Sequence, residues 1–244
     1  FIPVDSEHFS LWFGLNDNYN DIEKVVLTAS GGPFINLPLN KFKDISISNA
    51  LKHPNWKMGK KITIDSATMM NKVFETIEAK NIFNVPYKKI SILVHPKSYI
   101  HALVKFNDGM SKIILHDTTM KVPIFNSLYS ENDKSYGSSK LNINKLNDLN
   151  LQNADTKKFP LINIIKKIPN ESSLFETVIV SANDTLVNLY LKNKINFIDI
   201  QKKLIKLLDL KEFKKYKKIK PKNIDEIIKM NSKIKNKIEF LMKI

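Results

Sequence analysis

The sequence contains no cysteine and no arginine, and only six of its 244 residues are glycine. The missing cysteines exclude disulfide bonds and thiolate metal sites. The glycines stand at 14, 31, 32, 59, 109 and 137, a spacing that excludes the G-x-G-x-x-G fingerprint of dinucleotide-binding domains. We find no apolar run near the ~20 residues of a membrane span, and no stretch with the composition of a signal or transit peptide.

The formal net charge of +15 comes from lysine alone, because all 39 basic residues are lysines. Arginine is the preferred residue for bidentate contacts with bases and phosphates. The charge therefore favours a solvated surface over a binding patch, and we expect neither a nucleic-acid nor a membrane partner. A non-enzymatic basic protein that binds nucleic acid is the alternative function.

Hydrophobic periodicity and turn residues predict an α+β fold, in which a mixed-sheet domain precedes a C-terminal helical bundle. The predicted strands are 1–4, 23–30, 61–64, 90–94, 102–106 and 111–115. The predicted helices are 47–51, one ending near 83, 161–168, 174–191, 200–210 and one capped by Asn223. The predicted domains are 1–126 for metal and substrate, 127–158 as a linker or crossing arm, and 159–244 as the helical domain.

The stretch from Asp65 to Glu75 is typical of a short loop that leads into a helix. Ser66 or Thr68 is a suitable N-cap, because a side-chain oxygen there can accept from the first turn. Asn71, Lys72 and Glu75 would lie on one face of that helix. Such a helix start can bind phosphate, but a capped surface helix with an ion pair has the same pattern.

The segment Asp5-Ser6-Glu7-His8 follows the first predicted strand. In an extended chain Asp5 and Glu7 would point to the same side, and two carboxylates held together suit Mg²⁺ or Mn²⁺. A charged turn is the alternative. His8 is expected to make a structural hydrogen bond.

Two further segments combine backbone freedom with polar or aromatic side chains. Ser30-Gly31-Gly32-Pro33 ends a predicted strand and could present a hydroxyl and N–H groups to an anion, or form a plain turn. The segment 53–59, with His53, Trp56 and Met58 between Pro and Gly, suits a mobile flap over a site. A tryptophan in a loop is otherwise usually a packing anchor.

These motifs occur together and in one order, and this set resembles the 1-deoxy-D-xylulose 5-phosphate reductoisomerases. The segment His95-Pro96-Lys97-Ser98 also fits, so the first ~125 residues are closely similar to the family. The helical tail matches mainly in layout. Its segment Val180-Ser181-Ala182-Asn183-Asp184 departs from the family's Asn-Ala-Ala-Asn-Glu, which leaves the role of this segment open.

The resemblance implies the NADPH-dependent conversion of 1-deoxy-D-xylulose 5-phosphate to 2-C-methyl-D-erythritol 4-phosphate, in non-mevalonate isoprenoid biosynthesis. It corresponds to the catalytic and C-terminal domains, so we expect the NADPH-binding domain to lie outside this chain and the isolated chain to be inactive. The resemblance also implies a homodimer. A bacterial cytoplasm is the expected location, with a plastid as the alternative.

The resemblance further implies roles for individual residues. It implies one Mg²⁺ or Mn²⁺ ion bound by Asp5, Glu7 and Glu75, which together with His53 are the expected catalytic residues. Contacts to NADPH from this chain are expected at Met58 and Gly59. The implied substrate-binding residues are Ser6, Ser30, His53, Trp56, Ser66, Asn71 and Lys72.

Overall fold

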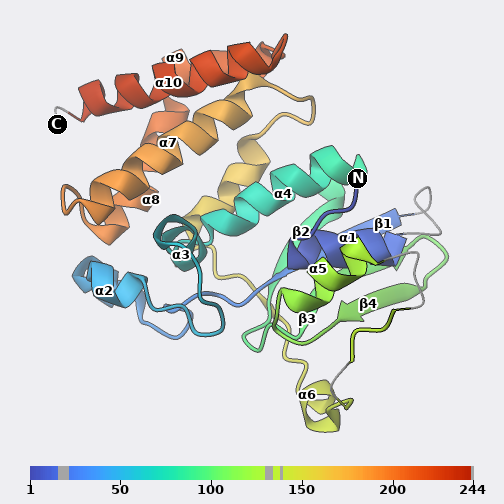
Figure 1. The fold of residues 1–244 in the computed structure, drawn as a ribbon. Coiled ribbons are helices and arrows are strands. Elements are labelled where there is room, and N and C mark those ends of the chain that lie inside the picture. Colours follow the sequence, from blue (N-terminus) through green and yellow to red (C-terminus); the bar gives the residue numbers. More distant parts are fainter. Residues whose placement is uncertain (16–21, 130–133, 138–139, 243–244) are drawn as a thin grey trace. The chain divides into compact units, whose positions relative to one another are not determined.

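The computed structural model describes residues 1–15, 22–129, 134–137 and 140–242 of the chain (Figure 1). These residues form two compact units, 1–31 with 78–154 and 32–77 with 155–244. Helix α4 (Met70–Phe83) runs through the division, so that its first half belongs to one unit and its second half to the other. No helix in the described part is both long and apolar enough to cross a bilayer.

The first unit is built on a mixed sheet. Its strands are β1 (Ile22–Ala29), β2 (Ile90–Val94), β3 (Ile100–Phe106), β4 (Ser111–Leu115) and β5 (Gln152–Asn153), in the order β4-β3-β1-β2-β5. Strand β1 pairs with β2 in parallel and with β3 antiparallel, and β3 pairs antiparallel with β4. The expected strands at 23–30, 90–94, 102–106 and 111–115 are therefore confirmed.

Helix α1 (Ser6–Leu15) packs on β3 and β4 and closes the core of this unit (Figure 1). Its buried Leu11 and Leu15 join Val25 and Leu27 of β1 and Val104 of β3 in one hydrophobic cluster. Burial of such side chains stabilises a fold by about 1.5–3 kcal/mol each, so this packing fixes α1 against the sheet. The remaining elements of the unit are η3 (Tyr87–Lys89), α5 (Lys121–Leu128) and α6 (Ile143–Asn147).

The predicted strand at 1–4 is wrong, because these residues form no regular secondary structure. Phe1 is 95% exposed and adds nothing to a core. The chain instead enters α1 directly at Ser6, and Asp5 is the residue that precedes the helix. The apolar run is too short for its period to distinguish a strand from an irregular lead-in.

The second unit is predominantly helical, and the α+β class of the chain is thereby confirmed. Helix α7 (Leu174–Leu191) packs against both α8 (Phe197–Asp209) and α10 (Ile224–Leu241) (Figure 1). The Asn223 side chain accepts from the Glu226 backbone N–H, which confirms the predicted cap of the last helix. The other elements of the second unit, besides the start of α4, are η2 (Leu39–Asp44), α2 (Ile47–Ala50), α3 (Lys60–Ala67), η4 (Pro160–Lys167), α9 (Lys211–Lys214) and η5 (Lys215–Lys218).

The predicted strand at 61–64 is also wrong, because these residues lie inside α3. Ser66 belongs to the last turn of α3, so it cannot cap the following helix. Thr68 follows α3, and its Oγ1 accepts from the Met70 backbone N–H at 3.4 Å. Met69, between Thr68 and Met70, has a positive φ of 61°, which turns the chain sharply into α4.

Candidate active site

The predicted site residues fall into two groups, one in each unit. Ser30 and the Asp5–Glu7 segment belong to the first unit, where α1 begins and β1 ends. The second unit contributes a loop, the end of α3 and the start of α4. The residues of this second group are His53, Trp56, Met58, Gly59, Ser66, Asn71, Lys72 and Glu75.

Asp5 caps helix α1. Its Oδ1 accepts from the backbone N–H groups of Glu7 and His8 at 3.1 and 3.2 Å, and the His8 ring contacts the same oxygen at 2.9 Å. His8 is buried and lies 3.8 Å from the Glu78 carboxylate, so it makes the structural contacts expected of it. Asp5 and Glu7 are therefore held by a helix start, and not by the extended strand that the sequence predicted.

Ser6 and Ser30 occupy two different ends of regular elements in the first unit. Ser6 is the first residue of α1, is buried, and donates its hydroxyl to the carboxylate of Glu7. Ser30 follows β1 directly and precedes the glycine pair. Ser6 thus places its hydroxyl at a helix start and Ser30 at a strand end.

His53 joins the loop 53–59 to the end of α3. Its Nδ1 accepts from the backbone N–H of Trp56 at 2.9 Å and of Asn55 at 3.2 Å. A ring nitrogen that accepts from two N–H groups carries no proton, so the proton of the neutral imidazole is on Nε2. His53 therefore donates from Nε2 to Ser66 Oγ, 3.1 Å away.

Burial lowers the pKa of His53, and the nearby positive charge of Lys72 lowers it further. Both effects disfavour the imidazolium, so His53 is neutral at pH 7. A neutral ring can keep Nδ1 as an acceptor and Nε2 as a donor at the same time. The loop and Ser66 thus meet at one ring whose two nitrogens have fixed and different roles.

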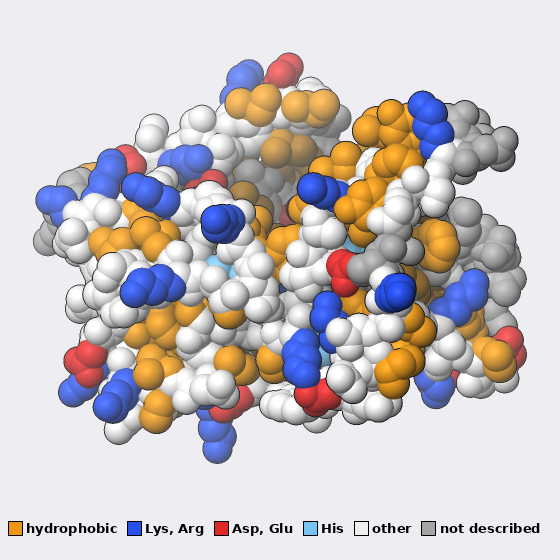
Figure 2. Space-filling model, turned by 60° about the horizontal axis from the view of Figure 1, so that its bottom comes forward, with side chains coloured by type: hydrophobic (Ala, Val, Ile, Leu, Met, Phe, Trp, Pro, Cys, Tyr) orange, Lys and Arg blue, Asp and Glu red, His pale blue; other side chains and the backbone are white. Residues whose placement is uncertain are grey.

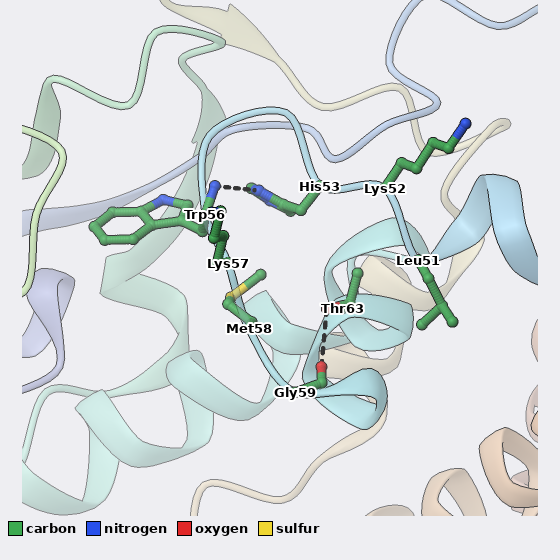
Figure 3. A pocket seen from close by; sticks show the side chains of 8 residues that line it. All are labelled: Leu51, Lys52, His53, Trp56, Lys57, Met58, Gly59 and Thr63. Atoms are coloured by element: carbon green, nitrogen blue, oxygen red, sulfur yellow. Dashed lines mark hydrogen bonds between the residues drawn. The ribbon is translucent and has the colours of Figure 1, made fainter.

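The loop 53–59 and helix α3 surround a pocket of about 570 Å³. Figure 3 shows the Met58 side chain pointing into the space between the loop and the helix, while Lys52 extends away from His53. Thr63 also lines the pocket, and its Oγ1 donates to the Gly59 carbonyl at 2.8 Å. The pocket therefore contains the predicted Trp56, Met58 and Gly59, while Leu51, Lys52, Lys57 and Thr63 were not predicted.

The start of α4 brings three predicted residues together. Lys72 Nζ donates to Glu75 Oε2 at 2.6 Å, and Asn71 Nδ2 donates to Glu75 Oε1. Lys72 and Glu75 are both buried, with 6% and 4% of their surface exposed. The expected shared face is confirmed, and it places a buried ammonium, an amide and a carboxylate on one turn of helix.

Gly32 lies directly against the end of α3. Its φ is +66°, and a Cβ at this position would be 2.9 Å from the carbonyl oxygen of Ser66. Only glycine allows both this backbone conformation and this close approach. The glycine pair therefore does more than turn the chain, because Gly32 allows the backbone to lie directly against Ser66.

Two residues close to the site escaped prediction from the sequence. Asp65 is buried at the end of α3, and Asn183 of α7 donates to it at 2.7 Å. The two residues are 118 positions apart in the chain. No local pattern connects residues at such a separation, although both lie in segments that stood out in the sequence.

Comparison with known proteins gives two family matches that together span most of the chain. A model described as the 1-deoxy-D-xylulose 5-phosphate reductoisomerase C-terminal domain matches residues 1–83. A second, described as the DXP reductoisomerase C-terminal domain, matches residues 115–237. Among curated relatives, the 1-deoxy-D-xylulose 5-phosphate reductoisomerase of Pelagibacter ubique is 60% identical over 239 residues. The corresponding protein of Sulfurihydrogenibium sp. is 41% identical over 209 residues.

These alignments cover 98% and 85% of the chain, but only 62% and 56% of the two relatives, so the chain spans somewhat more than half their length. A crystal structure of DOX-P reductoisomerase with NADPH, fosmidomycin and magnesium is similar at a TM-score of 0.89 and 31% identity, over 99% of this chain and 63% of that one. The Zymomonas mobilis enzyme with NADPH gives 0.85 and 32%, over 98% and 61%. The chain belongs to the 1-deoxy-D-xylulose 5-phosphate reductoisomerase family.

Proposed function

We propose that this chain provides the metal and substrate sites of an enzyme that converts 1-deoxy-D-xylulose 5-phosphate to 2-C-methyl-D-erythritol 4-phosphate. The observation that carries the proposal is the contact of His53 with Ser66, within reach of the Lys72 charge, in a chain of this family. A hydroxyl, a neutral imidazole and an ammonium are donors that suit a phosphate group. Family membership and site chemistry therefore support the same substrate class.

The phosphate would be held by Ser66, Asn71 and Lys72 of the second unit, together with Ser30. Lys72 supplies the only full positive charge of this set, and its buried position strengthens its attraction for an anion. Holding the phosphate also positions the reacting end of the substrate. Part of the translational and rotational entropy cost of the reaction is then met on binding, before the chemical step. The loop with Trp56 and Met58 would cover the bound substrate and exclude water.

The donor set fits a hard divalent cation, because Asp5, Glu7 and Glu75 offer carboxylate oxygens. Helix α4 carries Glu75 one turn before Glu78 and on the same face, and His8 links Glu78 to the Asp5 cap. We therefore assign Glu75 to the same ion as Asp5 and Glu7. Mg²⁺ or Mn²⁺ bound there would polarise the substrate ketone.

NADPH would supply the hydride for the reduction. From this chain, Met58 and Gly59 are the proposed contacts, because they lie where the loop 53–59 meets α3 and line the pocket. A thioether and a bare backbone form an apolar, adaptable surface for a planar ring. The solved relative bound to NADPH supports this assignment of the cofactor.

Calorimetry with 1-deoxy-D-xylulose 5-phosphate and Mg²⁺ tests the proposal. Lys72→Met should weaken binding roughly ten- to a hundredfold, because a charge-assisted hydrogen bond contributes about 1.5–3 kcal/mol. Lys80 is on the same helix and is only half-buried, so Lys80→Met is the matched control and should leave binding unchanged. Equal effects of the two variants, or equal affinity for the sugar without its phosphate, would contradict the phosphate site.

The alternative of a nucleic-acid-binding protein has no support among these findings. Figure 2 shows lysine side chains scattered over the face drawn, with apolar and neutral polar side chains between them. A binding patch would gather them along one stripe. The described chemistry gathers around carboxylates and a single buried lysine instead.

We also propose a homodimer. Strand β4 forms one edge of the described sheet; its Ile113 is 49% exposed, and Met110, which directly precedes the strand, is 66% exposed. An edge strand with apolar side chains is a ready surface for pairing with a second chain. Light scattering should give twice the mass of one chain, and Ile113→Lys should reduce it. A monomer at all concentrations would refute this assembly.

A further inference from the structure

We infer that the Asn183–Asp65 hydrogen bond is a positioning contact, through which helix α7 fixes the Ser66 hydroxyl and with it the His53 loop. Asn183 Nδ2 donates to Asp65 Oδ1 at 2.7 Å. Both residues are almost fully buried, with 0% and 1% of their surface exposed. The inference rests on the proposed function only for the identity of the ligand that Ser66 holds.

Helix α3 requires an anchor of this kind. It has only eight residues, and helices of this length are marginal without tertiary contacts. Asp65 and Ser66 lie in its last turn, where helices fray most readily. Because Asp65 directly precedes Ser66, holding its side chain restrains the backbone that carries the Ser66 hydroxyl.

The Asp65 carboxylate depends on its donors. Burial raises the pKa of Asp65, and the charged form is favoured by Lys61 and by the hydrogen bond from Asn183. Lys61 Nζ lies 2.7 Å from Asp65 Oδ2, so each carboxylate oxygen has its own donor. Loss of the Asn183 amide would leave one buried carboxylate oxygen without this partner.

The same segment of α7 makes a second contact with α3. Lys61 also lies 3.0 Å from Asp184 Oδ1, and Asp184 is within 3.7 Å of Lys235 on α10. The departure at 181–184 from the family pattern, noted in the sequence, therefore coincides with a polar junction. It lies in the middle of α7 and not at a helix start.

The junction connects to the pocket through consecutive contacts. From Asn183 it reaches Asp65, then the adjacent Ser66, and from Ser66 Oγ the ring of His53 at 3.1 Å. Gly32 also lies close to the Ser66 backbone, since a Cβ at position 32 would be 2.9 Å from the Ser66 carbonyl oxygen. Release of Asp65 would therefore change the distance between Ser66 and His53 before it changed the rest of the fold.

Ser181 provides a matched control on the same helix. Its buried hydroxyl lies 2.6 Å from Asn231 Oδ1 on α10 and 2.7 Å from the Thr177 carbonyl oxygen one turn earlier on α7, so its hydrogen bonds are directed away from α3. Ser181→Ala removes the buried hydroxyl contacts with Thr177 and Asn231, and Asn183→Ala removes the buried amide contact with Asp65. A purely structural role predicts similar effects from both, whereas a positioning role predicts an effect on His53 from Asn183→Ala alone.

The first measurement is the ¹⁵N spectrum of the His53 ring in the ligand-free chain. Asn183→Ala should shift or broaden the His53 Nε2 signal, and Ser181→Ala should leave it unchanged. The exchange Asn183→Asp with Asp65→Asn reverses donor and acceptor and should restore the signal. Unchanged His53 signals in Asn183→Ala, or equal changes in Ser181→Ala, would overturn the inference.

The second measurement is the affinity for 1-deoxy-D-xylulose 5-phosphate. Asn183→Ala should weaken it about tenfold, and should have no further effect once Ser66→Ala is present, because both act through one hydroxyl. Additive losses in the double variant would overturn the inference. If Ser66→Ala alone leaves the affinity unchanged, the phosphate site is wrong, while the His53 spectra still decide the positioning role.

Discussion

His53 Nε2 donates to Ser66 Oγ across 3.1 Å, and the opposite nitrogen of the same ring holds the backbone of the loop. One side chain therefore orders a loop and orients a hydroxyl. Both functions require the neutral ring, because protonation of Nδ1 would remove the acceptor on which the loop depends. The environment of His53 favours that neutral form.

The loop should loosen as the pH falls. Burial and Lys72 lower the pKa of folded His53 below 6.5, whereas the unfolded chain titrates near 6.5. Below that pH the unfolded state binds more protons, so stability should fall between 6.5 and the lower folded value, and be constant above 6.5. Urea unfolding between about pH 5 and 7 measures this.

The variant His53→Asn tests whether His53 is responsible. An asparagine side chain can still accept from N–H groups two and three residues later, but it has no charge to gain. The part of the pH dependence due to His53 should disappear in this variant. An identical pH profile in wild type and variant would assign the titration to another group.

Gly32→Ala should destabilise the second unit more than an ordinary glycine substitution. The new Cβ would strain a φ of +66° and lie 2.9 Å from the Ser66 carbonyl oxygen. Gly109 is the matched control, since its φ is +88° and nothing lies within 4 Å of its Cβ position. We expect about 1 kcal/mol for Gly109→Ala, and about 2 kcal/mol or more for Gly32→Ala.

Urea unfolding of the two glycine variants gives this comparison directly. In the NMR spectrum of the backbone amides, the Ser66 signal should also shift in Gly32→Ala and stay unchanged in Gly109→Ala. If both variants lose the same stability, then backbone conformation alone accounts for the effect and the close approach to α3 has no energetic weight.

The core of the second unit contains a cluster of aromatic rings that joins three separate segments. Phe42 of η2 contacts Phe159 and Phe197, each with ring centroids 6.1 Å apart, and all three are fully buried. Phe42→Ala should lower the unfolding free energy by about 3–5 kcal/mol, because the surrounding elements cannot move in to fill the cavity that it leaves. Phe240 is 77% exposed, so Phe240→Ala should change the unfolding free energy by less than about 0.5 kcal/mol.

Thermal unfolding followed by circular dichroism at helical wavelengths compares these two phenylalanine variants. A loss of stability in Phe42→Ala no larger than that in Phe240→Ala would show that the cluster contributes little.

The boundaries of helices and strands with a clear hydrophobic period could be predicted closely from the sequence. Helix α7 begins and ends at the residues expected, and β2 and β4 do the same. Each has a continuous apolar pattern bounded by turn residues or a cap, so local and tertiary preferences agree.

Helix α3 shows where this reasoning fails. The alternation Lys61-Ile62-Thr63-Ile64 has the period of a strand, and its β-branched residues favour one. In the structure Thr63 and Ile64 are both buried, and Lys61 pairs with Asp65 four residues later. Burial on several sides and this pairing outweigh a four-residue pattern that is too short to fix its period.

In the candidate site, too, some contacts could be predicted from the sequence and others could not. Asn71, Lys72 and Glu75 could be placed on one face because helical spacing alone brings them together. The contact between Asp65 and Asn183 could not be predicted, because it requires α7 to pack on α3 across 118 residues of chain. Local chemistry can be read from sequence, whereas the contacts that hold it in position depend on the tertiary fold.

We propose that Glu75, beside Lys72, binds a divalent cation together with Asp5 and Glu7. Titration of the chain with Mn²⁺, followed by calorimetry, tests it directly, with Glu239→Gln at an exposed position of α10 as the control for Glu75→Gln. We predict that Glu75→Gln weakens Mn²⁺ binding by at least about tenfold while Glu239→Gln leaves it unchanged, and that both variants keep the wild-type fold. Wild-type Mn²⁺ affinity in Glu75→Gln would contradict the account.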